Sequence, residues 1–155
     1  MRALLALLFV PRLLVSCLSG PGPKLTPVEI QAIQTREFET TKELAFRSVV
    51  GVFQDTGYTI DTASLETGLI TASSTSHTEF QPFVGNVVKL VRATATVEGM
   101  PNGKTNVRIN LVKQSESSSL YGQRGANSAP ILDAQEYENL FSRVQQGIFL
   151  RSAVK

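Results

Sequence analysis

The chain has 155 residues, of which 42% are hydrophobic and 18% charged, and this excludes both a disordered chain and a protein with many membrane spans. Its length fits one folded domain. Fifteen basic side chains include Arg2 and Arg12 of an N-terminal segment that we expect to be removed; the remaining 13 equal the 13 acidic ones. A neutral mature domain argues against nucleic acid as a partner.

Residues 1–16 are typical of a secretory signal peptide. Arg2 gives a positive start, and an apolar run follows from Ala3 to Val10, with Pro11 and Arg12 interrupting the apolar region after it. The run is much shorter than the ~20 residues of a membrane-spanning helix. We therefore expect this segment to direct export and to be cleaved.

Residues 14–17, Leu-Val-Ser-Cys, resemble the lipobox of bacterial lipoproteins. The resemblance implies cleavage before Cys17, lipidation of its thiol and a further acyl chain, such as palmitate, on the new amine. Leu18 rather than Asp follows Cys17, which by resemblance to enterobacterial sorting implies the periplasmic face of the outer membrane. The alternatives are a free or buried thiol and an uncleaved N-terminal anchor. Cys17 is the only cysteine, so no disulfide can form within the chain.

The lipidated N-terminus and a Gly- and Pro-rich tether are expected over residues 17–27, a single domain over 28–151 and a short tail over 152–155. Within the domain, the segment from Ile30 to Glu39 predicts a first strand, with Ile33 and Phe38 as its main apolar residues.

A helix is predicted from Thr41 to Thr56. Thr40 and Glu43 have the spacing of a capping box, and Gly57 can end the helix in a left-handed conformation. The expected buried stripe consists of Phe46, Val49, Val50 and Phe53.

Alternating apolar and polar residues then predict four strands. Tyr58 to Ala63 and Leu69 to Ser73 form a hairpin, and the segments Val87–Glu98 and Thr105–Lys113 follow with one apolar face each. A final helix begins at Asp133, with Glu136 completing a second capping box. Its expected buried stripe is Tyr137, Leu140, Phe141, Val144 and Ile148.

This order, β-α-β-β-β-β-α, predicts an α+β fold in which an antiparallel meander carries both helices on one face. The polar face, rich in Thr, Arg and Asn, is left to water or a partner. Alternating strand directions place the loops 74–86 and 115–132 at the same end of the sheet.

The run from Gln34 to Ala72, the Gly57-Tyr58 pair, the segment 121–123 and the final helix resemble small uncharacterised proteobacterial outer-membrane lipoproteins. In element order the domain is also similar to the helix-grip-like domains of BamC-type assembly lipoproteins. The resemblance implies a non-catalytic envelope protein.

Residues suited to catalysis are scarce. His77 is the only histidine and lies in a polar run, so no metal site and no cofactor are expected. The serines at 117–119 lack a nucleophile-elbow setting, and Asp61 and Glu66 flank a turn without an apolar pocket. The glycines of 99–103 lack the Lys-Ser/Thr of a phosphate loop. We therefore expect that the protein is not an enzyme.

The two long loops contain the residue types found at binding hot spots, namely Phe80, Phe83, Tyr121 and Arg124. We expect them to bind a protein partner; the alternative is that the aromatic residues close the end of the core.

Three functions remain open at this stage. The domain is a tethered binding module, a structural accessory protein that joins a homo-oligomer or larger assembly, or a carrier of a small molecule or lipid. The carrier requires a large apolar cavity between helices and sheet.

Overall fold

The computed structural model describes residues 25–81, 85–118 and 124–153, and within them it is an α+β fold of three helices and seven strands. In chain order the elements are α1 (Pro27–Gln34), β1 (Thr35–Phe38), α2 (Lys42–Asp55), β2 (Tyr58–Ser64), β3 (Leu69–Ser74), β4 (His77–Gln81), β5 (Gly85–Gly99), β6 (Thr105–Ser118), β7 (Arg124–Pro130) and α3 (Ala134–Ser152). The predicted α+β class is confirmed, but the chain forms one helix and two strands more than the sequence predicted.

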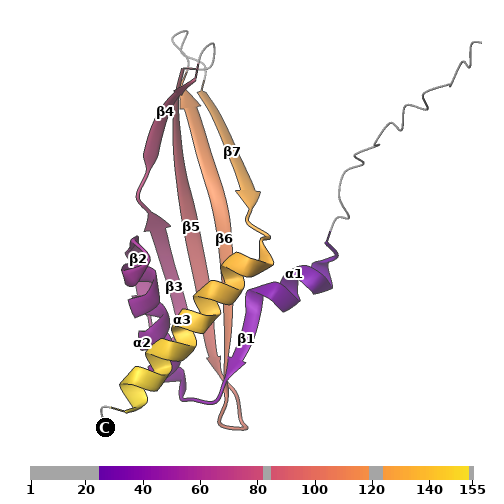
Figure 1. Ribbon diagram of the computed structural model, residues 1–155, viewed down its shortest axis with the longest axis vertical. Helices are drawn as coiled ribbons and strands as arrows, with labels where there is room; N and C mark the ends of the chain where they lie inside the picture. Colours follow the sequence, from indigo (N-terminus) through magenta and orange to yellow (C-terminus); the bar gives the residue numbers. More distant parts are fainter. Residues whose placement is uncertain (1–24, 82–84, 119–123, 154–155) are drawn as a thin grey trace, which may run out of the picture.

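All strands belong to one antiparallel sheet, and β5 and β6 run through its whole length (Figure 1). In the lower half of the figure the strand order is β2-β3-β5-β6-β1. In the upper half it is β4-β5-β6-β7. The predicted meander is therefore present as β2-β3-β5-β6, with β4 inserted in the chain between its second and third strands.

The strands are much longer than the helices that cover them. β5 and β6 have 15 and 14 residues, or about 45–50 Å at ~3.3 Å per residue. α2 has 14 residues and α3 has 19, or about 21 and 28 Å at 1.5 Å per residue. Both helices lie over the lower half of the sheet, so the upper half extends beyond them (Figure 1).

The core lies between α2, α3 and one face of the lower sheet. Odd-numbered side chains of β5 and β6 supply that face, including Ala93, Val97, Ile109 and Leu111, all fully buried. From the helices, the buried apolar side chains are Ala45, Phe46, Val49, Val52, Phe53, Tyr137, Leu140, Phe141, Val144 and Ile148. The predicted stripe of the last helix is confirmed in full, and that of α2 in three of its four residues, with Val50 only partly buried.

The first predicted strand is wrong over most of its length. Residues 27–34 form α1, and only Thr35–Phe38 are strand. The signal for this helix is Thr26 with Pro27 and Glu29: the Thr26 hydroxyl accepts a bond from the Glu29 N–H, and the Glu29 carboxylate accepts one from the Thr26 N–H. This carboxylate bonding also lowers the pKa of Glu29.

The cap of α2 is Thr41, not Thr40. Its hydroxyl accepts a hydrogen bond from Leu44 N–H at 3.4 Å. Thr40 instead uses its carbonyl oxygen, which accepts a 2.7 Å bond from the hydroxyl of Thr105 and so ties the helix start to β6. The predicted helix end is confirmed, since Gly57 follows the cap residue with a φ of 86°.

The two predicted loops are largely strands. Segment 74–86 contains β4, and segment 115–132 contains the end of β6 and all of β7. Their predicted shared position at one end of the sheet is confirmed, because β4 pairs with β5, β5 with β6 and β6 with β7. Asp133 caps α3 as predicted, but its carboxylate accepts from Gln135 N–H, and no reciprocal bond from Glu136 is seen within the described residues.

Arg36 links β1, the edge strand of the lower sheet next to β6, to α3. Its guanidinium makes two bonds, of 3.0 and 2.6 Å, to the carboxylate of Glu138 and lies 5.2 Å from the ring centre of Phe141. The bonds from Arg36 lower the pKa of Glu138, and the same contact raises the pKa of Arg36 further.

The hydroxyl of Tyr137 closes a gap along the edge of β6. β1 pairs with residues 105–108 of β6 and β7 with residues 112–118, which leaves 109–111 without a strand partner on that side. The Tyr137 hydroxyl accepts the N–H of Leu111 at 3.1 Å and donates to the carbonyl of Ile131 at 3.0 Å. It also accepts a 3.4 Å bond from the amide of Gln34, so its donor and both acceptor sites are used.

We expect Tyr137→Phe to lower the free energy of unfolding by about 1–3 kcal/mol, because it leaves the buried N–H of Leu111 without a partner. Urea denaturation measures this loss. Tyr58→Phe is the matched control: this half-buried tyrosine makes no hydroxyl bond within the described residues, and its loss should stay within about 0.5 kcal/mol. Equal losses for the two variants would contradict the role assigned to the Tyr137 hydroxyl.

Candidate functional site

The upper half of the sheet is the part of the fold that α2 and α3 leave open. We call it the extension and define it as β4, β7 and the stretches of β5 and β6 that pair with them, residues 77–81, 85–89, 112–118 and 124–130. All seven residues of β7 are exposed. In Figure 1 no helix lies over these strands in the described part of the chain.

The strand register shows which of the expected binding residues come together. Phe80 pairs with Asn86, Asn86 with Ser118, and Ser118 with Arg124, so Phe80 and Arg124 occupy one row across all four strands. Three strand spacings of ~4.8 Å separate the two backbones by about 14 Å. Phe83 and Tyr121, the other two expected residues, lie outside the described residues.

A shallow hollow of about 420 Å³ opens beside Arg124 on the β6–β7 side of the extension. Arg124 is exposed and makes no ion pair within the described residues, so its planar guanidinium is available to a partner. The hollow is lined by Val88, Glu116, Ser117, Ser118, Arg124, Gly125 and Ala126.

The opposite face of the extension carries an ion pair between Lys89 of β5 and Glu79 of β4. The hydrogen bond from Lys89, with its positive charge, lowers the pKa of Glu79. This pair engages the charges of Glu79 and Lys89, whereas Arg124 on β7 forms no ion pair with a described residue.

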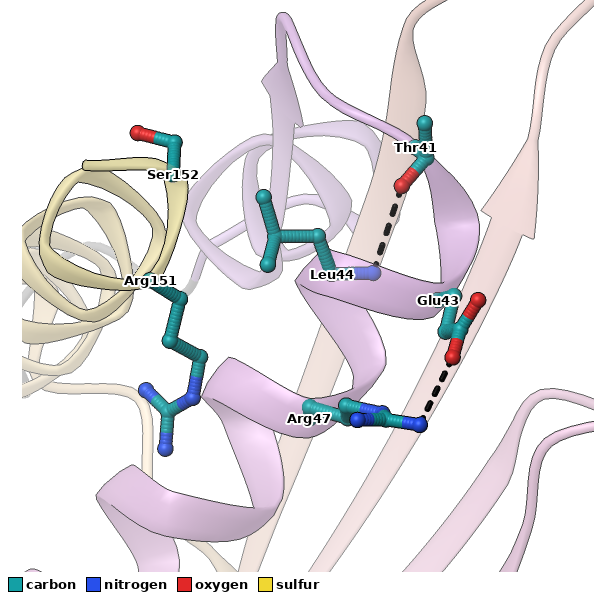
Figure 2. A pocket seen from close by; sticks show the side chains of 6 residues that line it. All are labelled: Thr41, Glu43, Leu44, Arg47, Arg151 and Ser152. Carbon is teal, nitrogen blue, oxygen red and sulfur yellow. Dashed lines mark hydrogen bonds and ion pairs between the residues drawn. The ribbon is translucent and has the colours of Figure 1, made fainter. Parts of the chain in front are cut away.

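A second hollow, of about 280 Å³, lies between the start of α2 and the end of α3 (Figure 2). Its two arginines already have structural partners. Arg47 pairs with Glu43 at 2.7 Å, and Arg151 donates to the carbonyl of Gly147 at 3.3 Å. Arg151 also lies directly over Gly51, where an added Cβ would come within 2.6 Å of its guanidinium. The Arg47 and Arg151 bonds each lie within one helix, and the position of Arg151 over Gly51 is the contact that joins α3 to α2, so we assign this hollow a structural role.

A third hollow, of about 230 Å³, lies on the face of the lower sheet that points away from α2 and α3. Its lining is polar and consists of Gln31, Thr35, Thr96, Glu98, Asn106 and Arg108. The sequence predicted a polar face here, but not this hollow, because Gln31 and Thr35 were assigned to one strand instead of to α1 and the start of β1. The N-cap signal at Thr26 predicts α1 and so could have indicated this hollow.

Other residues considered from the sequence do not form a catalytic group in the described part of the chain. His77 is exposed on β4, and Asp61 accepts a 2.6 Å bond from the hydroxyl of Ser73. Within the described residues, no set of three or more His, Cys, Asp or Glu side chains could hold a metal ion. Likewise, no helix described here is long and apolar enough to cross a membrane.

Comparison with known proteins adds no assignment: neither a protein-family model nor a curated protein matches the chain.

The extension should open more easily than the covered half of the sheet, since few apolar side chains pack on it. In a hydrogen-exchange experiment we expect the amides of β7 to be at least ~100-fold less protected than those of Ile109 and Leu111 in the core part of β6. Ile109 and Leu111 lie on β6, the strand with which β7 pairs, so they serve as the internal control. Equal protection in β7 and at Ile109 would mean that the extension is part of the core.

Proposed function

We propose that this protein is a lipid-anchored, non-catalytic binding module on the periplasmic face of the bacterial outer membrane, and that it docks a protein partner through the extension. The observation that carries the proposal is the mismatch between strands of about 45–50 Å and helices of about 21 and 28 Å. Within the described residues no helix covers the strands of the extension, although Val87 there is buried. An ordered surface of this kind suits a protein that presents it to a partner.

The charges of the extension favour a protein over a polyanion. Its basic residues are Lys89, Lys113 and Arg124, and its acidic ones are Glu79 and Glu116. Three basic against two acidic side chains give no extended positive patch for nucleic acid or for anionic lipid headgroups.

The free edge of β7 offers a way to bind such a partner. β7 pairs on one side with β6, and no strand within the described residues lies on its other side. Its sequence after Arg124 consists of small residues and one proline, Gly-Ala-Asn-Ser-Ala-Pro. Small side chains let another backbone approach, and an exposed edge can accept an added strand. Arg124, exposed at the start of β7, supplies a multi-donor contact next to this edge.

The carrier alternative is less well supported, because aromatic side chains fill the space between helices and sheet. Phe53 and Phe141 are 0% and 1% exposed, and Phe46 is 7% exposed. The three hollows described above all open at the surface rather than between these layers.

Cys17→Ala tests the anchor. We expect the variant to lose labelling by a palmitate analogue and to accumulate as unprocessed precursor, because the acylated thiol is what the processing peptidase requires by resemblance to other lipoproteins. Ser16→Ala, which keeps a small residue before the cysteine, is the control and should be labelled and processed. A Cys17→Ala protein that still fractionates with the outer membrane would contradict lipid anchoring.

Photo-crosslinking in intact cells tests the docking surface. A photoreactive residue in place of Ala126, beside Arg124 on β7, should give a discrete crosslinked protein, whereas one at Gln54 on the exposed side of α2 should not. Adding Arg124→Ala should reduce the product several-fold without lowering the melting temperature by more than about 2 °C. Arg143→Ala on α3 is the matched control, since it removes another exposed arginine.

The proposal fails if position 126 gives no crosslink or if Arg143→Ala weakens the crosslink as much as Arg124→Ala does. A product of twice the chain's mass would identify the partner as a second copy.

A further inference from the structure

The outer face at the end of α3 carries two large apolar side chains. The buried stripe of this helix ends at Ile148, and Phe149 and Leu150 follow roughly 100° and 200° further round the helix. Both therefore point away from the core, and they are 68% and 64% exposed. An open hollow of about 490 Å³ on this face is lined by Gln145, Gln146, Phe149 and Leu150. All four belong to α3, so this is an open helix face and not a cleft between elements.

The charge on α3 changes sign along its length. Its first two turns contain acidic residues, whereas residues 142–155 contain three basic side chains and no acidic one. Two of the basic residues, Arg143 and Arg151, are exposed. Glu43 of α2 also lies near this end, but it already pairs with Arg47 at 2.7 Å. The exposed apolar pair therefore lies in positively charged surroundings.

These two features together favour a lipid surface over a second copy of the chain. A stable protein interface buries roughly 800 Å² on each partner, and two apolar side chains supply only a small part of such an area. A second copy packed symmetrically on this face would also bring Arg143 close to its counterpart, and like charges in contact are unfavourable. An interfacial helix instead combines Phe and Leu with neighbouring Lys or Arg, which anionic headgroups attract.

The proposed anchor brings this face within reach of a bilayer. Residues 18–26 can span at most about 30 Å. α1 is about 12 Å long, and its last residue, Gln34, bonds to Tyr137 of α3. From Tyr137 to Phe149 is about 18 Å along α3. A lipid on Cys17 and the end of α3 can therefore meet the same membrane.

The other exposed apolar side chains lie away from the extension. Among the side chains that the structure describes, the large apolar ones that are exposed are Leu25, Val28, Leu65, Leu69, Phe149 and Leu150. Leu65 lies in the turn between β2 and β3, and Leu69 follows that turn. The Glu66 carbonyl of the turn accepts a 2.8 Å bond from Lys42 at the start of α2. The start of α2 in turn shares the hollow of Figure 2 with the end of α3. Apolar exposure therefore gathers at the lower end of the fold and next to the tether.

We infer that the end of α3 lies on an anionic lipid bilayer, with Phe149 and Leu150 at the boundary between headgroups and acyl chains and with Arg143 and Arg151 among the headgroups. This boundary lies ~5–10 Å deep. Because β5 and β6 run from the lower end of the fold to the extension, the contact points the extension away from the membrane (Figure 1). The inference rests on the proposed anchor for bringing the chain to the bilayer, but not on the docking of a partner.

Tryptophan fluorescence tests the inference, because the chain contains no tryptophan of its own. Phe149→Trp places a single reporter on the face. The full lipidated chain is reconstituted into vesicles of phosphatidylethanolamine and phosphatidylglycerol in equal parts, and its association is checked by flotation. We expect the emission to lie at a short wavelength and to fall at least about twofold when the lipids carry brominated acyl chains. Asn139→Trp, in line with Leu150 but nearer the start of α3, is the matched control and should be quenched little.

Two changes should weaken the quenching of the Phe149→Trp reporter. Adding Leu150→Gln removes the second apolar contact and should leave the thermal melt unchanged, because the side chain is exposed. Vesicles of phosphatidylcholine alone remove the negative headgroup charge.

The inference is overturned if the chain floats with the vesicles while the reporter is quenched no more than the Asn139→Trp control; the anchor would then stand. A chain that does not float with the vesicles overturns the anchor as well. A short-wavelength emission that brominated lipid does not quench, and that grows with the amount of protein per vesicle, would mean that a second copy covers the face instead of lipid.

Discussion

The edge of β6 is the constraint on which the rest of this fold depends. One continuous strand of 14 residues must satisfy its backbone groups on that edge, and no single neighbour is long enough to do so. β1 serves the first part, β7 serves the last, and the hydroxyl of Tyr137 serves Leu111 between them. Because Tyr137 belongs to α3 and also bonds to Ile131 and Gln34, the same atom fixes the start of α3, the end of β7 and the end of α1.

This arrangement divides the sheet into two parts with different energetics. Below Leu111 the strands are covered by α2 and α3, and burial of side chains such as Phe53 and Phe141 supplies the stability. Above it, the strands are held mainly by backbone pairing with β5 and β6, which continue from the core as a stiff template. The extension is therefore held in shape by strands that continue from the core. A partner that packs on it meets strands that are already ordered, so binding does not have to supply the conformational entropy of ordering them.

The predictions from sequence hold where local patterns determine the structure and fail where pairing with β6 determines it. The hairpin of β2 and β3 and the buried stripe of α3 follow from alternation and from 3.6-residue periodicity, and both are found. β7 has Gly, Asn, Ser and Pro in seven residues, a composition typical of loops, and becomes a strand only because the edge of β6 is available to it. For α1 the local signal existed in Thr26, Pro27 and Glu29, but the apolar pair Ile33 and Phe38 favoured a strand. Of the proposed binding residues, Arg124 lies on the exposed extension, whereas the polar hollow depends on the packing of α1 against β1 and cannot be inferred from spacing.

The proposed anchor places a limit on where the partner can be. Residues 18–26 separate Cys17 from the first helix, and nine residues span at most about 30 Å when fully extended. If the proposed lipid holds the chain, a domain whose longest strands measure about 45–50 Å stays close to the bilayer. Under the proposed anchoring, the extension would stay within a few tens of ångströms of the membrane surface, at a high effective concentration for a partner fixed there. A weak edge-strand contact suffices under this condition, so an exposed and sparsely apolar surface such as β7 is adequate for a membrane-bound partner and would be inadequate for a freely diffusing one.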